Sequence, residues 1–193
     1  DFVDIDPLSY NLSAENLKKK LQHAKENNLP LPKVVIPVHL CGQPCEMDKI
    51  HALGQEYGFA IIEDASHAIG GKYKGNPIGN CEYSDITVFS FHPVKIVTTA
   101  EGGVVTTNSK ELAAKLDLLR SHGITRDSSL MQNDSHGGWY YEQVDLGFNY
   151  RMTEMQAALG VSQMSRLHDF VAKRNALAAR YDELLKGLPL VTP

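Results

Sequence analysis

"VVIPVHLCGQPCEMDKIHALGQEYGFAIIEDAS", residues 34–66, changes its apolar pattern twice along its length. Its two ends are runs of β-branched and other apolar residues, which are typical of strands covered on both faces. The middle has the apolar spacing of a helix that begins near Asp48 and ends at Gly58. A strand, a helix and a second apolar strand in succession favour a layered α/β domain.

The same alternation continues on both sides of this unit. Ser13 is a suitable N-cap for a helix early in the chain. Further strands are expected at residues 2–6, 84–91 and 102–108, and helices at residues 10–28 and 109–123. Together these elements predict an α/β domain with a mostly parallel sheet layered with helices.

The last third of the chain has a different pattern. Residues 124–143 are polar and include Trp139, and their length favours a binding or interface loop over a simple connection. Thr153 and Gln156 form a capping-box signature. From there to residue 185 the sequence keeps a helical pattern, which predicts one long helix.

These patterns divide the chain into two parts. We predict one domain over residues 1–152, and over residues 153–193 a connecting helix with the start of a small second domain. The first residue is Asp1 rather than Met, and the sequence ends where another extended segment begins. The chain is therefore expected to be part of a longer protein.

Composition narrows the classes of partner. A formal net charge of −4 over 193 residues gives no basic field for nucleic acid or for an anionic membrane. No apolar run approaches the ~20 residues of a membrane-spanning helix. Three cysteines, an odd number, do not indicate a disulfide framework and fit a reducing cytoplasm. We expect a cytoplasmic protein with small-molecule ligands.

Phosphate-loop and metal motifs are weak or absent. Neither GxGxxG nor GxxxxGK[ST] occurs, and "GGKYKG", residues 70–75, is expected to be a turn. A metal site could be assembled from His39, Cys41, Cys45 and His51, but the C-x3-C spacing is looser than that of paired zinc ligands. Half-buried cysteines near a turn are the simpler interpretation, and no metal is expected.

The segment "EDASHA", residues 63–68, places acids at the end of an apolar strand. Ligands of α/β sheets bind outside the carboxyl ends of the strands. Asp64 is therefore a candidate site residue, although a carboxylate there could simply cap the following turn. His67, three residues later, is a second candidate, with a core histidine as the alternative.

A lysine marks the end of the next strand, in "SFHPVKIVTTAEGG", residues 90–103. Burying an unpaired ammonium costs several kcal/mol, so Lys95 either extends its amine to water or is neutral and reactive. A desolvated lysine forms Schiff bases with aldehydes such as pyridoxal phosphate. That cofactor also needs a carboxylate for its pyridine nitrogen and donors for its phosphate. Asp64, Lys95 and Ser90 could supply these three parts from one sheet edge.

Three segments carry a resemblance to a known family. "EDASHAIGGKYKGNPIG" (63–79), "SDITVFSFHPVKIVTTAEGG" (84–103) and "LGFNYRMTEMQAALG" (146–160) resemble the DegT/DnrJ/EryC1/StrS family of sugar aminotransferases. The resemblance covers nearly the whole chain. It implies the large domain, in part, of a fold-type I enzyme that uses pyridoxal phosphate, followed by a helix leading to a small domain.

The resemblance assigns roles to residues of this chain. It implies that Lys95 forms the Schiff base with pyridoxal phosphate, that Asp64 pairs with the pyridine nitrogen, and that His67 lies against the ring or its hydroxyl. Ser90 would bind the phosphate. Asn149 would reach the phosphate of a neighbouring subunit, which implies a homodimer with shared active sites.

The substrate follows less directly. His92 and Arg151 are weaker candidates for contacting a nucleotide-sugar, since an arginine suits diphosphate oxygens but could equally form a surface ion pair. Overall likeness is greatest to the members that aminate the 4-keto carbon of UDP-4-keto-6-deoxy-sugars in pseudaminic acid biosynthesis. Glutamate would be the amino donor.

The resemblance also indicates what this chain lacks. In the family, further phosphate donors and an aromatic that stacks on the ring precede the segment matched here, and the small domain follows it. The chain alone is therefore expected to bind the cofactor weakly and to be inactive. A non-catalytic regulatory or binding protein with the same fold is the alternative, because fold does not fix function.

Overall fold

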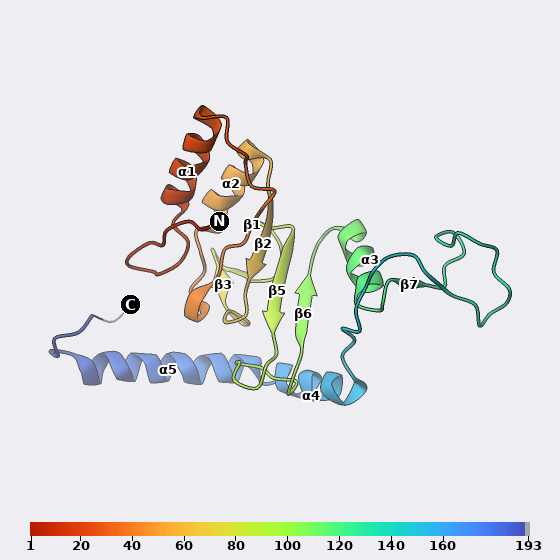
Figure 1. Ribbon diagram of the computed structural model, residues 1–193. Coiled ribbons are helices and arrows are strands. Elements are labelled where there is room, and N and C mark those ends of the chain that lie inside the picture. Colours follow the sequence, from red (N-terminus) through yellow and green to blue (C-terminus); the bar gives the residue numbers. More distant parts are fainter. Residues whose placement is uncertain (192–193) are drawn as a thin grey trace.

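The computed structural model describes residues 1–191 (Figure 1). In chain order its helices and strands are α1 (Ala14–Glu26), β1 (Val34–Val35), the 3-10 turn η1 (Leu40–Gly42), α2 (Met47–Tyr57), β2 (Ala60–Asp64), β3 (Lys72–Tyr73), β4 (Asn76–Pro77), β5 (Ile86–Ser90), β6 (Gly103–Thr106), α3 (Lys110–Leu119), β7 (Ile124–Thr125), β8 (Glu142–Gln143), α4 (Glu154–Met164) and α5 (Leu167–Leu185). None of the described helices is both long and apolar enough to cross a membrane.

A four-stranded sheet in the order β1-β2-β5-β6 forms the centre of the molecule. β1 pairs with β2, and β2 with β5, in parallel, whereas β6 runs antiparallel to β5. The predicted α/β fold with a mostly parallel sheet is therefore confirmed. α4 and α5 run across the edge at which β2 and β5 end (Figure 1).

One face of the sheet is covered by α1 and α2. Val35 and Ile61 project from this face into a core with Leu17, Leu21 and Ile50, all of them buried. Ser13 caps α1 by accepting a hydrogen bond from the Asn16 N–H at 3.2 Å, as predicted. α2 ends at Gly58, whose φ of +76° is the left-handed conformation that favours glycine.

On the opposite face of the sheet, one prediction from the sequence is wrong. Residues 34–40 were expected to be covered on both faces, but Val34, Ile36 and Val38 are 43%, 55% and 42% exposed. No described helix packs over these three side chains. The segment is also a shorter strand than expected, because Pro37 has no N–H for a ladder and pairs only through its carbonyl, which accepts from the Asp64 N–H at 2.9 Å.

The strand predicted at residues 2–6 is absent from the structure. This segment makes only one bridge, between Ile5 and Leu12. It finds no neighbouring strand among residues 1–191 with which to pair its backbone groups, and an unpaired segment has no ladder. In contrast, residues 70–75 form the predicted turn, with Lys74 and Gly75 linking β3 to β4.

The single helix predicted from residue 153 to residue 185 is wrong, because α4 and α5 are separate helices. The break lies at Ser165 and Arg166. Both side chains donate to the Ser162 carbonyl, from Oγ at 2.9 Å and from Nε at 3.4 Å, and so compete with the helical backbone for that acceptor. The predicted capping box of Thr153 and Gln156 is present at the start of α4.

The polar segment at residues 124–143 forms an arm that extends from the body (Figure 1). β7 and β8 pair antiparallel at its base. The carboxylate of Glu142 closes the arm by accepting from the backbone N–H groups of Gln132 at 2.6 Å and Asn133 at 3.1 Å. These bonds, with that from Tyr140, lower the pKa of Glu142 to about 2.

Candidate active site

Two predicted site residues lie at the ends of neighbouring strands. Asp64 is the last residue of β2 and Ser90 is the last residue of β5. Asp64 is in register with Val88, and side chains two residues apart share a face of a sheet. Asp64 and Ser90 therefore lie on one face of the sheet, at the carboxyl ends of neighbouring strands. Ligands of parallel sheets bind at this end.

The Asp64 backbone is fixed from both sides. Its N–H donates to the Pro37 carbonyl at 2.9 Å and its carbonyl accepts from the His39 N–H at 3.0 Å, while the next N–H, of Ala65, donates to Val88 at 2.9 Å. Its half-buried carboxylate accepts from the Ser66 N–H at 3.0 Å through Oδ1. The second carboxylate oxygen makes no hydrogen bond within residues 1–191, so it can accept one from a ligand.

The Ser90 hydroxyl is positioned to donate a hydrogen bond to a ligand. Its Oγ accepts a hydrogen bond from the His92 N–H at 3.4 Å. A hydroxyl carries one proton and two acceptor lone pairs, so this contact leaves the Ser90 proton for another partner. The arrangement suits an anionic oxygen placed beyond the end of β5.

Lys95 lies on the connection between β5 and β6. The Lys95 N–H donates to the His92 carbonyl at 3.0 Å, which makes a tight turn after β5. Val97 and Thr99, both fully buried, anchor the following residues in the core. The lysine itself is half-buried, and its amine makes no hydrogen bond or ion pair within the described chain.

Lys95 and His67 line the same cleft, of about 920 Å³, between the turn after β2, η1 and α5. The Cys41 N–H donates to His67 Nδ1 at 3.3 Å. Nδ1 is thereby used as an acceptor, so the ring proton lies on Nε2. The structure thus brings together two of the predicted site residues, with Asp64 and Ser90 at the adjoining strand ends.

Three other predicted residues lie elsewhere. His92 is exposed next to the β5 end, and its Nδ1 accepts from the Val94 N–H at 3.4 Å. Asn149 is exposed and bridges Ser121 through its backbone. Arg151 lines a second cleft, of about 850 Å³, over β6 and α3. Within this chain neither Asn149 nor Arg151 lines the cleft that contains Lys95, and their roles stay predictions.

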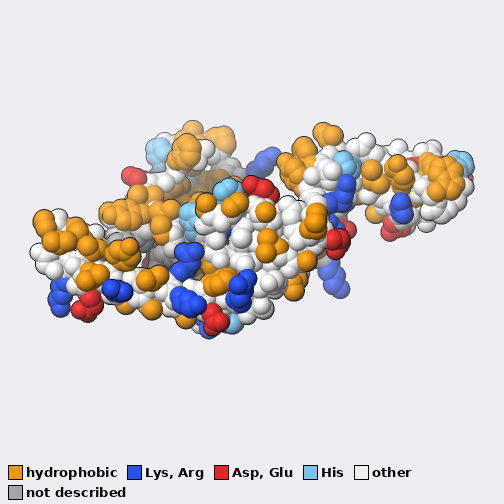
Figure 2. All heavy atoms as spheres, turned by 90° about the horizontal axis from the view of Figure 1, so that it is seen from below, with side chains coloured by type: hydrophobic (Ala, Val, Ile, Leu, Met, Phe, Trp, Pro, Cys, Tyr) orange, Lys and Arg blue, Asp and Glu red, His pale blue; other side chains and the backbone are white. Residues whose placement is uncertain are grey.

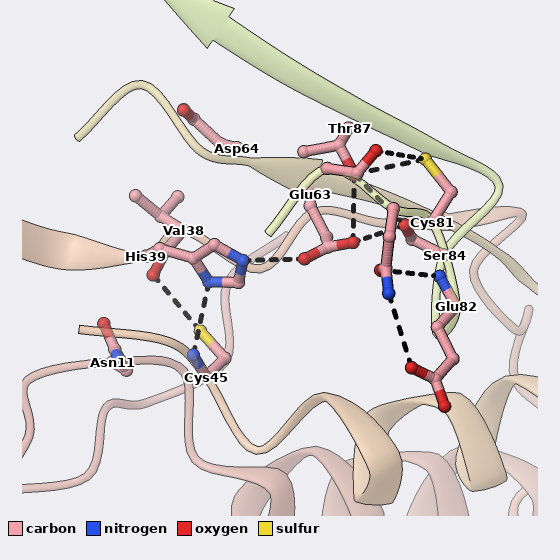
Figure 3. Close-up of polar contacts among 12 residues, drawn as sticks. Asn11, Val38, His39, Cys45, Glu63, Asp64, Cys81, Glu82, Ser84 and Thr87 are labelled. Atoms are coloured by element: carbon pink, nitrogen blue, oxygen red, sulfur yellow. Dashed lines mark hydrogen bonds and ion pairs between the residues drawn. The ribbon is translucent and has the colours of Figure 1, made fainter. Parts of the chain in front are cut away.

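A buried polar network was not predicted from the sequence. His39 and Glu63 are 0% and 5% exposed, and His39 Nε2 donates to Glu63 Oε2 at 2.8 Å. The Thr87 hydroxyl donates to Glu63 Oε1 at 3.0 Å, and the Ser84 hydroxyl donates to the same oxygen. Figure 3 shows Glu63 between these partners, with Asp64 turned away from them.

The network sets the protonation state of Glu63. Burial alone would raise the pKa of Glu63, but the hydrogen bonds from His39, Ser84 and Thr87 outweigh it and hold the pKa below its usual value. His39 Nδ1 accepts from the Cys45 N–H at 3.2 Å, so Nε2 is the atom that donates to the carboxylate. Glu63 is therefore a buried carboxylate on the sheet face opposite Asp64.

The four residues considered for a metal site do not form one. His39 bonds to Glu63, the Cys45 thiol donates to the Val38 carbonyl at 3.2 Å, and His51 Nδ1 lies 3.2 Å from the Tyr83 carbonyl oxygen. Burial raises the pKa of the Cys45 thiol to about 12, which disfavours the thiolate that a metal needs. Within residues 1–191 no three His, Cys, Asp or Glu side chains converge to hold an ion.

Comparison with known proteins identifies the family to which this chain belongs. The chain belongs to the DegT/DnrJ/EryC1/StrS aminotransferase family, whose model matches residues 1–193. The chain is 39% identical over 183 residues to a UDP-4-amino-4,6-dideoxy-N-acetyl-beta-L-altrosamine transaminase of Campylobacter jejuni, covering 95% of this chain and 44% of that protein. It is 38% identical over 193 residues to the spore coat polysaccharide biosynthesis protein SpsC of Bacillus subtilis, covering all of this chain and 47% of SpsC.

A solved structure agrees with these relatives. Helicobacter pylori PseC, an aminotransferase involved in the biosynthesis of pseudoaminic acid, superposes with a TM-score of 0.84 at 32% identity. The match covers 100% of this chain and 47% of PseC. The chain thus spans about half the length of the proteins it matches.

Proposed function

We propose that the complete protein is a pyridoxal phosphate-dependent aminotransferase. It would move an amino group from an amino acid, glutamate, to the 4-keto carbon of a nucleotide-linked 6-deoxy-sugar such as UDP-4-keto-6-deoxy-N-acetylhexosamine. The observation that carries the proposal is the placement of Asp64 and Ser90 on one face at adjoining strand ends, with Lys95 on the connection that follows.

The side chains at this edge fit pyridoxal phosphate. Asp64 has a carboxylate oxygen for a protonated pyridine nitrogen, Ser90 has a proton for the phosphate, and His67 has Nε2–H as a donor for the ring hydroxyl. Lys95 offers the amine for the aldehyde. When bound, the cofactor supplies that aldehyde and a ring that withdraws electrons from the reacting carbon.

The residues of this chain then have separate tasks. Asp64 keeps a proton on the ring nitrogen, since an ionised carboxylate favours the charged form of a neighbouring base. Lys95 Nζ would be the base that removes the proton from the α-carbon of the amino donor. In the second half of the reaction the same amine would deliver a proton to the sugar carbon that receives the amino group.

Several features of the whole protein belong to the same proposal. Asn149 would act in the active site of a neighbouring subunit, so the enzyme would be a homodimer, and His92 and Arg151 would contact the nucleotide-sugar. Residues 1–152 would belong to the large domain and residues 153–193 would lead into the small one. The 193-residue chain by itself would bind the cofactor weakly and be inactive.

The biological setting follows from the relatives and from the cysteines. The product would be an amino sugar for pseudaminic acid or a related cell-surface polysaccharide. Cys41, Cys45 and Cys81 are all free thiols, which is consistent with a reducing cytoplasm. A regulatory or binding protein with this fold is less favoured, because Asp64, Ser90 and Lys95 are all retained.

A visible spectrum of the complete protein with pyridoxal phosphate tests the proposal. We expect an absorption band that borohydride fixes covalently at Lys95 and that glutamate bleaches. Lys95→Ala should lose the covalent adduct, whereas Lys110→Ala, an exposed lysine at the start of α3, should retain it. A band that persists in Lys95→Ala, or the absence of any band in the wild type, would favour the binding-protein alternative.

A further inference from the structure

We propose that the cleft beside Lys95 contains a subsite for an oxyanion of a substrate, a carboxylate or a phosphate, recognised by Arg174 and His168 of α5. This inference rests on the proposed function for its choice of substrates. The cleft is lined by three cationic side chains, Lys72, Lys95 and Arg174, and by two histidines, His67 and His168, with no aspartate or glutamate among its lining residues.

The local charge opposes that of the whole chain. The chain carries a formal net charge of −4, yet every charged side chain that lines this cleft is basic. Lys and Arg side chains gather over the middle of the face that contains α4 and α5 (Figure 2). A depression lined by one sign of charge concentrates ligands of the opposite sign.

Apart from His67, the basic side chains of this cleft have no hydrogen-bond or ion-pair partner within residues 1–191. Elsewhere in the chain, Lys74 forms an ion pair with Asp48, and Arg120 forms one with Asp117. The charges of these two basic side chains are therefore already balanced. Within residues 1–191, by contrast, the side chains of Lys72, His168 and Arg174 make neither a hydrogen bond nor an ion pair. Their donors are therefore available to a ligand.

Close packing fixes α5 as the wall of the cleft. Gly70 has a φ of +83°, and a Cβ there would lie 2.8 Å from Val171 Cγ2 and 3.1 Å from Leu167 Cδ1. Leu167 is buried at this contact. Val171, Arg174 and Asn175 follow at i+3 and i+4 spacing, so the helix face held against Gly70 is the face that lines the cleft.

The opposite wall is also defined. The Cys41 N–H occupies His67 Nδ1 at 3.3 Å, which leaves Nε2–H as the donor of that ring. The 3-10 turn that carries Cys41 lies directly against His67, because a Cβ on Gly42 would be 3.0 Å from the His67 carbonyl oxygen. His67, in the turn after β2, and the basic side chains of α5 therefore lie on two sides of one cavity.

The chemistry of the donors selects the ligand class. A cavity of about 920 Å³ is large enough for a small-molecule ligand. A guanidinium recognises carboxylate and phosphate through two parallel hydrogen bonds, and a histidine adds one donor. Both substrates of the proposed reaction carry such groups, the amino donor as carboxylates and the nucleotide-sugar as its diphosphate.

Calorimetric titration of the complete protein, stripped of cofactor, tests the subsite without measuring catalysis. The probes are glutarate, for the amino donor, and inorganic pyrophosphate, for the nucleotide-sugar. We expect Arg174→Ala to bind one of them about tenfold more weakly than the wild type, as for the loss of a charged hydrogen bond. Arg180→Ala, which removes an arginine of α5 outside the cleft, is the matched control and should bind normally.

The outcomes separate the possibilities. Selective loss of glutarate binding supports a donor-carboxylate subsite, and selective loss of pyrophosphate binding supports a diphosphate subsite. Wild-type affinity of Arg174→Ala for both probes, no binding of either probe by the wild type, or weakening of pyridoxal phosphate binding alone would overturn the inference. If the Lys95-dependent absorption band fails while Arg174-dependent binding persists, the proposed function falls and the subsite stands.

Discussion

Replacing Glu63 with glutamine tests the buried network while keeping the shape of the side chain. The Glu63 carboxylate accepts three hydrogen bonds, from His39, Ser84 and Thr87. Glutamine still accepts from His39 through its one oxygen, but its amide group must then face the two hydroxyls. We expect Glu63→Gln to lower the free energy of unfolding by about 2 kcal/mol, the value typical of hydrogen bonds to a charged group.

The stabilisation by Glu63 depends on pH because the pKa of its carboxyl group is shifted by folding. The pKa of Glu63 is lower in the folded protein than its ordinary value. The ionised carboxylate therefore stabilises the fold above the unfolded pKa of about 4.3, and this stabilisation is lost as the pH falls through the folded value. The difference in stability between the wild type and Glu63→Gln should be largest near neutral pH and should shrink as the solution is acidified below about pH 4.

Urea unfolding followed by circular dichroism measures this difference at each pH. For a chain of this size, about 2 kcal/mol corresponds to a drop of roughly 4–8 °C in Tm, which thermal unfolding can check. Glu183→Gln, at an exposed position in α5, is the control and should change stability by less than about 0.5 kcal/mol. A Glu63→Gln variant as stable as the wild type, or a deficit that does not change with pH, would refute this account of the network.

Two further substitutions test the packing and capping of the C-terminal helices. Gly70→Ala should cost about 1–3 kcal/mol, because its Cβ would overlap Val171 at a positive φ. The control is Gly75→Ala, at a φ of +87° but with open space around it, which should cost only about 1 kcal/mol in backbone strain. If Gly70→Ala and Gly75→Ala lowered the stability to urea equally, the contact between Gly70 and α5 would be contradicted. Thr153→Ala should cost about 1 kcal/mol through loss of the capping box, and an unchanged urea midpoint would show that α4 does not depend on its cap.

The sequence predicted those elements whose signals are local. The cap at Ser13, the glycine at the end of α2 and the box at Thr153 each depend on side chains within a few residues, and all three are confirmed. The strand expected at residues 2–6 failed because it depends on a distant partner, whereas the single helix expected over residues 153–185 failed through local competition for the Ser162 carbonyl. Residues 2–6 have strand-like residues, but within the described chain they have no neighbouring strand.

The candidate site shows the same division. The residue types at Asp64, Ser90 and Lys95 suggested a cofactor because each stands at a predicted strand end. The Glu63 network could not be predicted from spacing, because His39, Ser84 and Thr87 meet Glu63 only through the sheet register. Inward alternation of Val35, Pro37 and His39 was the one available signal that His39 would be buried.

The antiparallel direction of β6 has a consequence for how this site can change. If the strand after β5 ran parallel to it, a crossover connection would have to carry the chain back to the end of the sheet at which β5 begins. Here Phe91 and Gly102 are joined by a backbone hydrogen bond of 2.8 Å, so the loop that carries Lys95 leaves and re-enters the sheet at one edge. Changes among the exposed residues 92–94 can therefore alter the surroundings of the lysine, while Val97 and Thr99 hold the returning chain in the core. Variation in that loop offers evolution a route to new substrates without a new scaffold.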